Sequence, residues 1–245
     1  GHEILVIPCV NRYSMNVGKR FWTMDNTDIN RMFPGYMQGE TTQRIAGALF
    51  DAVRGYRYGI HFASFYLPGD FVPHVRIMNT GYQTSSLGNL FGLPYVVMRT
   101  PKPIDTTTLN YNWQIWESNA FSIYTKETAN IDEESATQAV SAVLRYLSRV
   151  GVVKYACHSG YLSTVINEND LATVLTPSGG IFRALRVPGQ EVEYGDTIGE
   201  ILDPFTAQVV APVTATTSGL VFFAMDKPLV LEHEVAFKLI RRLHA

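Results

Sequence analysis

The sequence predicts an α/β sheet flanked by helices, followed by a small all-β unit. Three observations lead to this fold class. Apolar residues recur at helical spacing in two segments, 42–53 and 133–150, and short apolar runs lie between them. Strands that alternate with helices in this way are typical of a sheet with helices packed on its faces. From residue 179 onward, short strand-like runs alternate with glycine turns, which indicates an all-β unit.

Two polar stretches predict long loops in the first part of the chain. Residues 11–36 are rich in Gly and Asn, and residues 65–83 are rich in Pro, Gly and aromatic side chains. A loop as long as the second one, inside a compact domain, usually has a function. Short apolar runs outside these loops predict strands at residues 4–8, 58–64, 95–98 and 121–125.

The helices are indicated by apolar faces and by their end residues. The clearest one covers 133–150, where Asp132 is a candidate N-cap and Gly151 stands where a C-terminal stop is expected. Another helix is predicted over 42–53, where apolar residues recur every four positions. A shorter helix is expected over 109–118.

The composition changes near residue 155, and we place a domain boundary there. The first domain, 1–154, is expected to hold the α/β sheet and the catalytic groups. The second domain, 155–245, is expected to be rich in strands and to end the chain.

Overall composition narrows the class of protein. Of 245 residues, 46% are hydrophobic and 17% charged, which is typical of a globular protein. The net charge of −2 gives no reason to expect nucleic acid or an anionic membrane as a partner. The two cysteines, Cys9 and Cys157, lack metal-site spacing. We therefore expect a cytoplasmic protein, and a homo-oligomer is compatible with the sequence.

An Asn-Arg pair, Asn30 and Arg31, lies in a polar turn, with Arg20 a few residues upstream. A planar guanidinium makes a two-pronged contact with a carboxylate, and an adjacent amide adds a third polar group. This set is suited to hold the carboxylate of an amino-acid-like substrate. The alternative is structural: a turn Asn, an ion pair between Arg31 and Asp28, and a surface charge at Arg20.

His61 lies in the C-terminal half of a predicted strand, where ligands gather in open α/β sheets, so a metal could bind there. Glu127 follows the strand at 121–125 and could take a proton from a metal-bound water. Each has a structural alternative, namely a buried histidine bonded to the backbone and a solvated glutamate beside Lys126. For either residue taken alone, the structural alternative is favoured.

His74 and Arg76 lie two residues apart in the predicted long loop. In an extended segment two such side chains point the same way. They could contact a polar group of the substrate, or they could close the loop by hydrogen bonding, and the two interpretations stand level. We count both as candidate substrate-binding residues.

Several strings together resemble the succinylglutamate desuccinylase/aspartoacylase family, a branch of the zinc carboxypeptidase-like hydrolases. The strings are Val6 to Asn11, Gly18 to Arg20 and the more specific Asp28 to Gly35. Gly59 to His61 is similar to the family strand that ends in Asp-x-His, and Tyr124 to Glu127 is similar to its Thr-x-Glu. The resemblance covers nearly the whole chain. It implies a mixed, carboxypeptidase-like sheet flanked by helices and a small β domain at the C-terminus.

The resemblance also implies an activity, which is zinc-dependent hydrolysis of an N-acyl amide bond in a small substrate with a free carboxylate. Zinc lowers the pKa of its bound water towards neutrality, so hydroxide is available at working pH. The implied roles are zinc ligation by His61, general base catalysis by Glu127, carbonyl polarisation by Arg20, and carboxylate binding by Asn30 and Arg31.

The sequence departs from the family pattern at the metal site. The family places its first two zinc ligands in a His-Gly-x-Glu-type motif before the strand at 4–8, and no His-x-x-Glu occurs in this chain. We therefore expect the N-terminal strand and the first ligand motif to be missing. Gly59 also replaces the acidic residue two positions before His61. The alternative function is a non-catalytic carboxylate-binding protein on the same fold. A carboxypeptidase acting on peptides is disfavoured, because the small β domain of the family narrows access.

Overall fold

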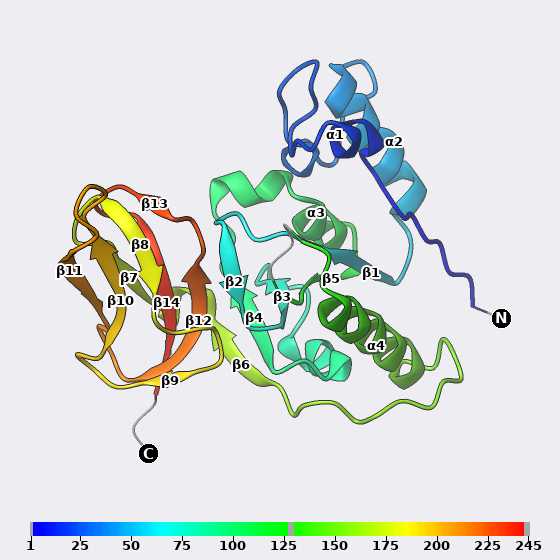
Figure 1. Cartoon of the computed structure of the whole chain (residues 1–245). Helices are drawn as coiled ribbons and strands as arrows, with labels where there is room; N and C mark the ends of the chain where they lie inside the picture. Colours follow the sequence, from blue (N-terminus) through cyan, green and yellow to red (C-terminus); the bar gives the residue numbers. More distant parts are fainter. Residues whose placement is uncertain (1, 127–129, 243–245) are drawn as a thin grey trace.

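The computed structural model describes residues 2–126 and 130–242 of the chain. Two parts lie side by side (Figure 1). In one, helices surround a sheet, and in the other the described residues form strands joined by turns. The predicted mixed α/β fold is confirmed for the first part.

The first part is built on a five-stranded mixed sheet with the strand order β1-β5-β3-β4-β6. Strand β3 is antiparallel to β5, and the other neighbouring pairs are parallel. Parallel neighbours need crossover connections, which here run through helical segments. The strands are β1 (Tyr58–Phe62), β3 (His74–Met78), β4 (Tyr95–Arg99), β5 (Asn119–Tyr124) and β6 (Thr164–Asn167).

Helices cover both faces of this sheet. On one face α4 buries Ala142 and Tyr146 against Phe121 and its strand neighbours. On the other face α3 buries Trp113 against Ala120, together with residues of α2. The helices are α1 (Arg12–Asn16), α2 (Thr41–Val53), α3 (Leu109–Ile115) and α4 (Glu133–Arg149), with 3₁₀ helices η1 (Ile29–Arg31), η2 (Ser85–Phe91), η3 (Pro103–Thr107) and η4 (Glu168–Asp170).

The helix ends follow the chemistry expected from the sequence. Asp132 caps α4 by accepting a hydrogen bond from the Ser135 backbone at 2.7 Å, and Gly151 adopts φ 80° just beyond the helix end. The first turn of α2 is held by a carboxylate from another segment: Asp25 accepts hydrogen bonds from the backbone and the hydroxyl of Thr42. Among the described residues, no helix combines the length and apolar character needed to cross a bilayer.

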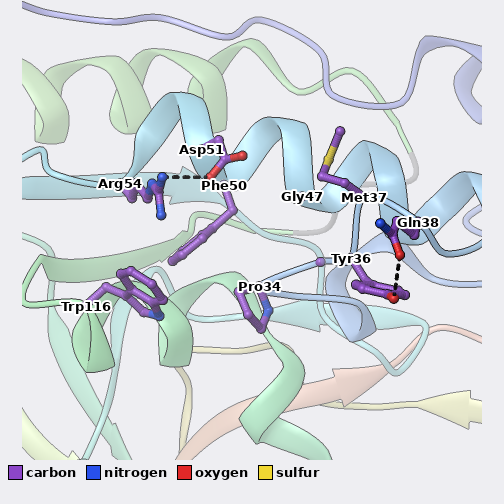
Figure 2. Close-up of a pocket in the computed structure, with 10 residues that line it drawn as sticks. Pro34, Tyr36, Met37, Gln38, Gly47, Phe50, Asp51, Arg54 and Trp116 are labelled. Carbon is purple, nitrogen blue, oxygen red and sulfur yellow. Dashed lines mark hydrogen bonds and ion pairs between the residues drawn. The ribbon is translucent and has the colours of Figure 1, made fainter.

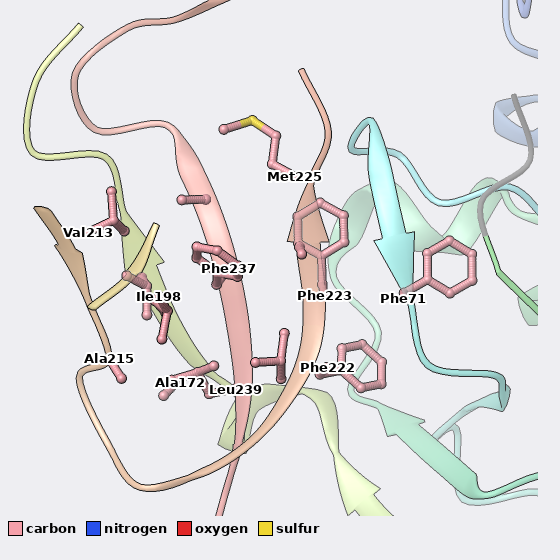
Figure 3. Packing of buried hydrophobic residues seen from close by; sticks show 14 of the residues in the cluster. Phe71, Ala172, Ile198, Val213, Ala215, Phe222, Phe223, Met225, Phe237 and Leu239 are labelled. Atoms are coloured by element: carbon pink, nitrogen blue, oxygen red, sulfur yellow. The ribbon is translucent and has the colours of Figure 1, made fainter. Parts of the chain in front are cut away.

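The second part contains two antiparallel sheets packed face to face around a large apolar core. Figure 3 shows buried side chains of this core, in which Phe237 meets Phe182 of the facing sheet, whereas Phe222 and Phe223 contact His74 and Phe65. One sheet has the order β11-β10-β8-β13 and the other β2-β12-β14-β7, with β9 also paired to β12. The strands are β2 (Gly69–Phe71), β7 (Ala172–Leu175), β8 (Gly180–Ala184), β9 (Glu191–Val192), β10 (Thr197–Leu202), β11 (Val209–Thr214), β12 (Gly219–Met225), β13 (Leu229–Val230) and β14 (Val235–Arg241).

The two parts exchange strands. Strand β2 comes from the first third of the chain but pairs with β12 in the second part. Strand β6 follows residue 155 but pairs with β4 in the first sheet. One apolar cluster also spans both parts, with Phe65, Val97 and Tyr124 packed against the core of the second. The boundary at residue 155 stays a prediction, and the strands on its two sides are interleaved.

Three predictions of local structure are wrong. Residues 11–36 are not one long loop, because they contain the short helices α1 and η1. Residues 4–8 form no strand, and their apolar side chains are exposed, with Val6 73% exposed. Residues 65–83 are not one long loop, because they contain β2 and β3. All five residues of β3 are buried, so the strand lacks the alternation of a half-buried strand, and Pro73 just before it reads as a loop signal.

A cluster of buried charges joins the sheet to the start of the second part. Glu168 accepts a hydrogen bond from Arg99 at 2.7 Å and lies 3.7 Å from Arg76. Arg99 also binds Asp105 at 2.9 Å. Burial alone would raise the pKa of Glu168, but the two guanidinium groups outweigh it and hold this pKa below its usual value. The carboxylate therefore stays ionised and paired at neutral pH.

Replacement of this carboxylate is expected to destabilise the protein strongly. In Glu168→Gln, the buried Arg76 and the partly buried Arg99 lose their shared negative partner, so we expect the unfolding free energy to fall by about 3 kcal/mol. Urea denaturation at pH 7 measures the change. Glu191→Gln is the control, because Glu191 pairs with Arg242 but is 75% exposed, and its loss is expected within about 0.5 kcal/mol. Equal losses in the two variants would contradict this account.

Candidate functional site

The sheet brings three polar side chains into one row. His61 on β1 pairs with Ser122 on β5, and Ser122 pairs in turn with Arg76 on β3. Residues directly opposite each other on neighbouring strands point to the same face of a sheet. The row therefore lies on the face that carries α3, which is opposite to α4.

Helix α3 lies over this face because Gly59 leaves room for it. A Cβ atom at Gly59 would come within 2.6 Å of the Trp113 ring, so a side chain there would displace the helix. The same placement brings Asn110 to the row, where its amide donates to the Ser122 hydroxyl at 2.8 Å. Gly59 is thus explained by packing in this chain.

His61 is a neutral ring held on two sides. Its Nε2 atom is hydrogen-bonded to the Ser122 hydroxyl, and Trp113 meets the ring edge-to-face with centroids 5.9 Å apart. Burial lowers the pKa of His61 to about 4, so the ring carries no charge at neutral pH. Its Nδ1 atom has no hydrogen-bond partner among residues 2–126 and 130–242.

The Asn-Arg pair lies against the N-terminal end of α3. Asn30 accepts a hydrogen bond from the backbone of Leu109 at 3.0 Å, so its side-chain oxygen satisfies the first turn of the helix. Arg31 donates to the Ile104 carbonyl at 3.3 Å and lies 3.9 Å from Asp105. The Arg31 side chain is 31% exposed. It is therefore a partly open guanidinium whose carboxylate contact is longer than a hydrogen bond.

Arg20 is engaged in the turn that carries this pair. Its Nε and Nη2 atoms donate to one oxygen of Asp28 at 3.0 and 2.8 Å. The other oxygen of Asp28 accepts from the backbone of Asn30 at 2.9 Å. The structural alternative predicted an ion pair between Asp28 and Arg31, but Asp28 pairs with Arg20 instead. Arg20 thus supports the turn, and its expected role on the scissile carbonyl stays a prediction.

His74 and Arg76 lie in the interior of the molecule, in β3. The His74 ring stacks on Tyr124 with centroids 4.7 Å apart, and its Nδ1 contacts the Val72 carbonyl at 2.9 Å. Burial lowers the pKa of His74 to about 3, and the charge of Arg76 adds to the effect. Arg76 donates to the Tyr124 hydroxyl at 3.1 Å and pairs with Glu168. These contacts join the two parts of the fold, and a contact with substrate stays a prediction.

Sequence reasoning missed Ser122 and Asn110. Ser122 is one of two small residues in β5, and only the strand register shows that it adjoins His61. Asn110 lies on a short helix whose orientation depends on the packing of Trp113 on Gly59. Neither residue carries a motif signal. Glu127, the predicted general base, lies outside the described residues.

A hollow of about 410 Å³ lies beside α2 (Figure 2). The turn at 34–38 forms one wall, and Arg54 lies over the Trp116 ring at 5.6 Å. The turn can approach α2 because Gly35 has no side chain: a Cβ atom there would lie 2.1 Å from the Gly47 nitrogen. The Pro-Gly end of the family-like string therefore serves to dock this turn on the helix.

The fold is shared with solved structures of known families. A succinylglutamate desuccinylase/aspartoacylase from Rhodobacter sphaeroides matches with a TM-score of 0.79 and 19% identity over 98% of this chain and 75% of that one. The product-bound ectoine utilization protein EutE (DoeB) from Ruegeria pomeroyi matches at 0.80 and 18%, over 96% and 73%. A succinylglutamate desuccinylase from Silicibacter sp. TM1040 matches at 0.82 and 18%, over 95% and 73%.

The likeness is one of fold. No protein-family model matches the sequence, and no curated protein matches it. At the identities above, the solved structures establish a common architecture, and the resemblance inferred from the sequence is confirmed at that level.

A side chain at Gly59 is expected to disturb the site. In Gly59→Ala the added methyl group meets the Trp113 ring, so we expect a loss of about 1–3 kcal/mol in unfolding free energy from overpacking. Urea denaturation measures it. Gly179→Ala is the matched control, since the nearest atom to its Cβ would be 3.4 Å away. A Gly59→Ala protein as stable as this control would show that the Trp113 contact does not constrain α3.

The buried ring of His74 predicts a loss of stability in acid. The pKa of His74 is about 3 in the folded protein and 6.5 in its ordinary state, so between these values the unfolded chain takes up the proton first. Stability therefore falls as pH drops from 7 to 5, and His74 contributes up to about 2 kcal/mol to this fall. Urea midpoints at both pH values should differ less in His74→Gln. The exposed His158→Gln should keep the wild-type difference, and a His74→Gln protein that also keeps it would contradict the account.

Proposed function

We propose that the protein is an amide hydrolase of the deacylase type, acting on a small N-acyl amino acid or related amide with a free carboxylate. The observation that carries the proposal is the fold shared with desuccinylase and aspartoacylase structures along nearly the whole chain. The second support is the gathering of Asn30, Arg31 and His61 around α3. A cytoplasmic location belongs to the same proposal.

Arg31 is the group best suited to meet the substrate carboxylate. Its side chain is partly open, and its nearest carboxylate, Asp105, lies at 3.9 Å and is already held by Arg99. A guanidinium in this state can turn its free donors to a ligand. Arg20 and Asn30 act through the turn, since both keep Arg31 at the end of α3.

The residues that the structure describes do not fit a catalytic zinc ion. Such an ion needs three protein ligands and an open position. No group of three His, Cys, Asp or Glu side chains within 2–126 and 130–242 could hold a metal. His61 is the family-like ligand, and within these residues it does not belong to such a group. We derive no step through zinc from these residues, and the role of Glu127 as general base remains part of the proposal.

Hydrolysis of N-acyl amino acids by the full chain, with metal content measured in the same samples, tests this function. Arg31→Ala is expected to raise KM roughly ten- to hundredfold for a substrate with a free carboxylate, because a charged hydrogen bond is lost. A methyl ester of the same substrate should be turned over equally by wild type and variant.

The control for this measurement is Arg54→Ala. Arg54 is a half-exposed arginine paired with Asp51 in the hollow beside α2, at the C-terminal end of α3, whereas Arg31 lies at the N-terminal end. Its replacement should leave KM unchanged. Absence of hydrolysis for every acyl amino acid tested would reject the proposed activity.

A second candidate function is metal-independent binding of a small carboxylate without turnover. The lack of a three-ligand metal cluster in the described part of the chain favours it. Calorimetry with an N-acyl amino acid in the presence of a chelator tests it. Binding that persists there, without release of the amine, supports the binding protein, whereas binding that disappears with the metal supports the hydrolase.

A further inference from the structure

A chain of hydrogen bonds runs from the surface to His61. At the outer end, the Thr80 hydroxyl contacts the side-chain oxygen of Gln114. The Gln114 amide nitrogen donates to the Asn110 oxygen at 3.1 Å, and the Asn110 nitrogen donates to the Ser122 hydroxyl at 2.8 Å. Ser122 completes the chain at Nε2 of His61. The three middle side chains are buried, so these are the contacts that satisfy them.

The outer end of this series of hydrogen bonds decides which group donates and which accepts at each step. The backbone of Tyr82, which can only donate, bonds to the Thr80 oxygen at 3.3 Å. The Thr80 hydroxyl proton is thereby left for Gln114. The side-chain amides of Gln114 and Asn110 each accept a hydrogen bond with their oxygen and donate one with their nitrogen. Every hydrogen bond in the series is therefore donated towards His61. The Ser122 hydroxyl accepts from Asn110, and its own proton is left for His61.

A neutral imidazole that accepts at Nε2 carries its proton on Nδ1. We propose that Thr80, Gln114, Asn110 and Ser122 are positioning residues that hold His61 as the Nδ1–H tautomer, which presents an N–H donor to a carboxylate or carbonyl oxygen of the ligand. This donor has no hydrogen-bond partner among the residues described, so it is available to a ligand oxygen. The proposal goes beyond the function proposed above, because it concerns the ligand-free protein and requires neither metal nor turnover.

The same chain explains why His61 does not fit a metal ligand as it stands. A metal ion binds a ring nitrogen that has no proton. Ligation through Nδ1 would move the proton to Nε2, so Ser122 would accept hydrogen bonds from both His61 and Asn110. The Ser122 hydroxyl proton would then lose the ring nitrogen as its acceptor. The direction of the hydrogen bonds thus selects oxygen ligands over metal ions at this nitrogen.

Nuclear magnetic resonance of uniformly ¹⁵N-labelled full chain at pH 7, with chelator present, tests the tautomer directly. Two-bond ¹H–¹⁵N spectra of histidine rings distinguish a protonated from an unprotonated nitrogen, and the signals of His61 are assigned by their loss in His61→Gln. The expected wild-type result is a protonated Nδ1 and an unprotonated Nε2. A protonated Nε2 in the wild type overturns the proposal. Because no substrate is used, this result is independent of whether amides are hydrolysed.

Variants at the two ends of this series of hydrogen bonds test whether the series sets the tautomer of His61. Ser122→Ala removes the donor and is expected to give a mixture of the two tautomers. Thr80→Val removes the outer hydroxyl, four hydrogen bonds from His61, and is expected to shift the population towards Nε2–H. Thr84→Val is the matched control, since the Thr84 hydroxyl pairs with Ser86 and takes no part in the hydrogen bonds that lead to His61. A tautomer population unchanged in Thr80→Val, as in Thr84→Val, overturns the role of the series.

Discussion

The contact between the Trp113 ring and Gly59 is the constraint on which the site depends. The ring lies so close to the strand that no side chain fits beneath it, so α3 is held at one height above the sheet. At this height Asn110 reaches Ser122, and the start of the helix reaches Asn30. Gly59 departs from the metal-site pattern of the family, and it is also the residue that allows these polar groups to meet.

The sheet face beneath α3 separates two kinds of polar interaction. On one side of Ser122, the row ends in the neutral ring of His61 and a set of uncharged amides. On the other side it continues through Arg76 into a cluster of paired charges around Glu168. Buried ions demand close partners, whereas neutral amides can form a directional chain at little electrostatic cost. The charged side joins the two parts of the fold, and the neutral side positions the ring of His61.

Sequence reasoning found the elements whose pattern is local. Helices α2 and α4 were predicted within a residue or two, because their apolar faces are long and Asp132 is a clear cap. Strand β3 was missed because buried His74 and Arg76 look like loop residues until their partners Tyr124 and Glu168 are known. The candidate ring of His61 was found, but the residues that orient it were not, since their meeting depends on strand register and helix packing.

The exchange of strands between the two parts has a consequence for how the chain folds after synthesis. Strand β2 leaves the ribosome long before its partner β12, and the first sheet stays open at one edge until β6 follows. Pairing between such distant segments forms late, because the loop between them must close first. Neither part can reach its final form alone, so the molecule is expected to fold as one cooperative unit that is completed only when its last strands have emerged.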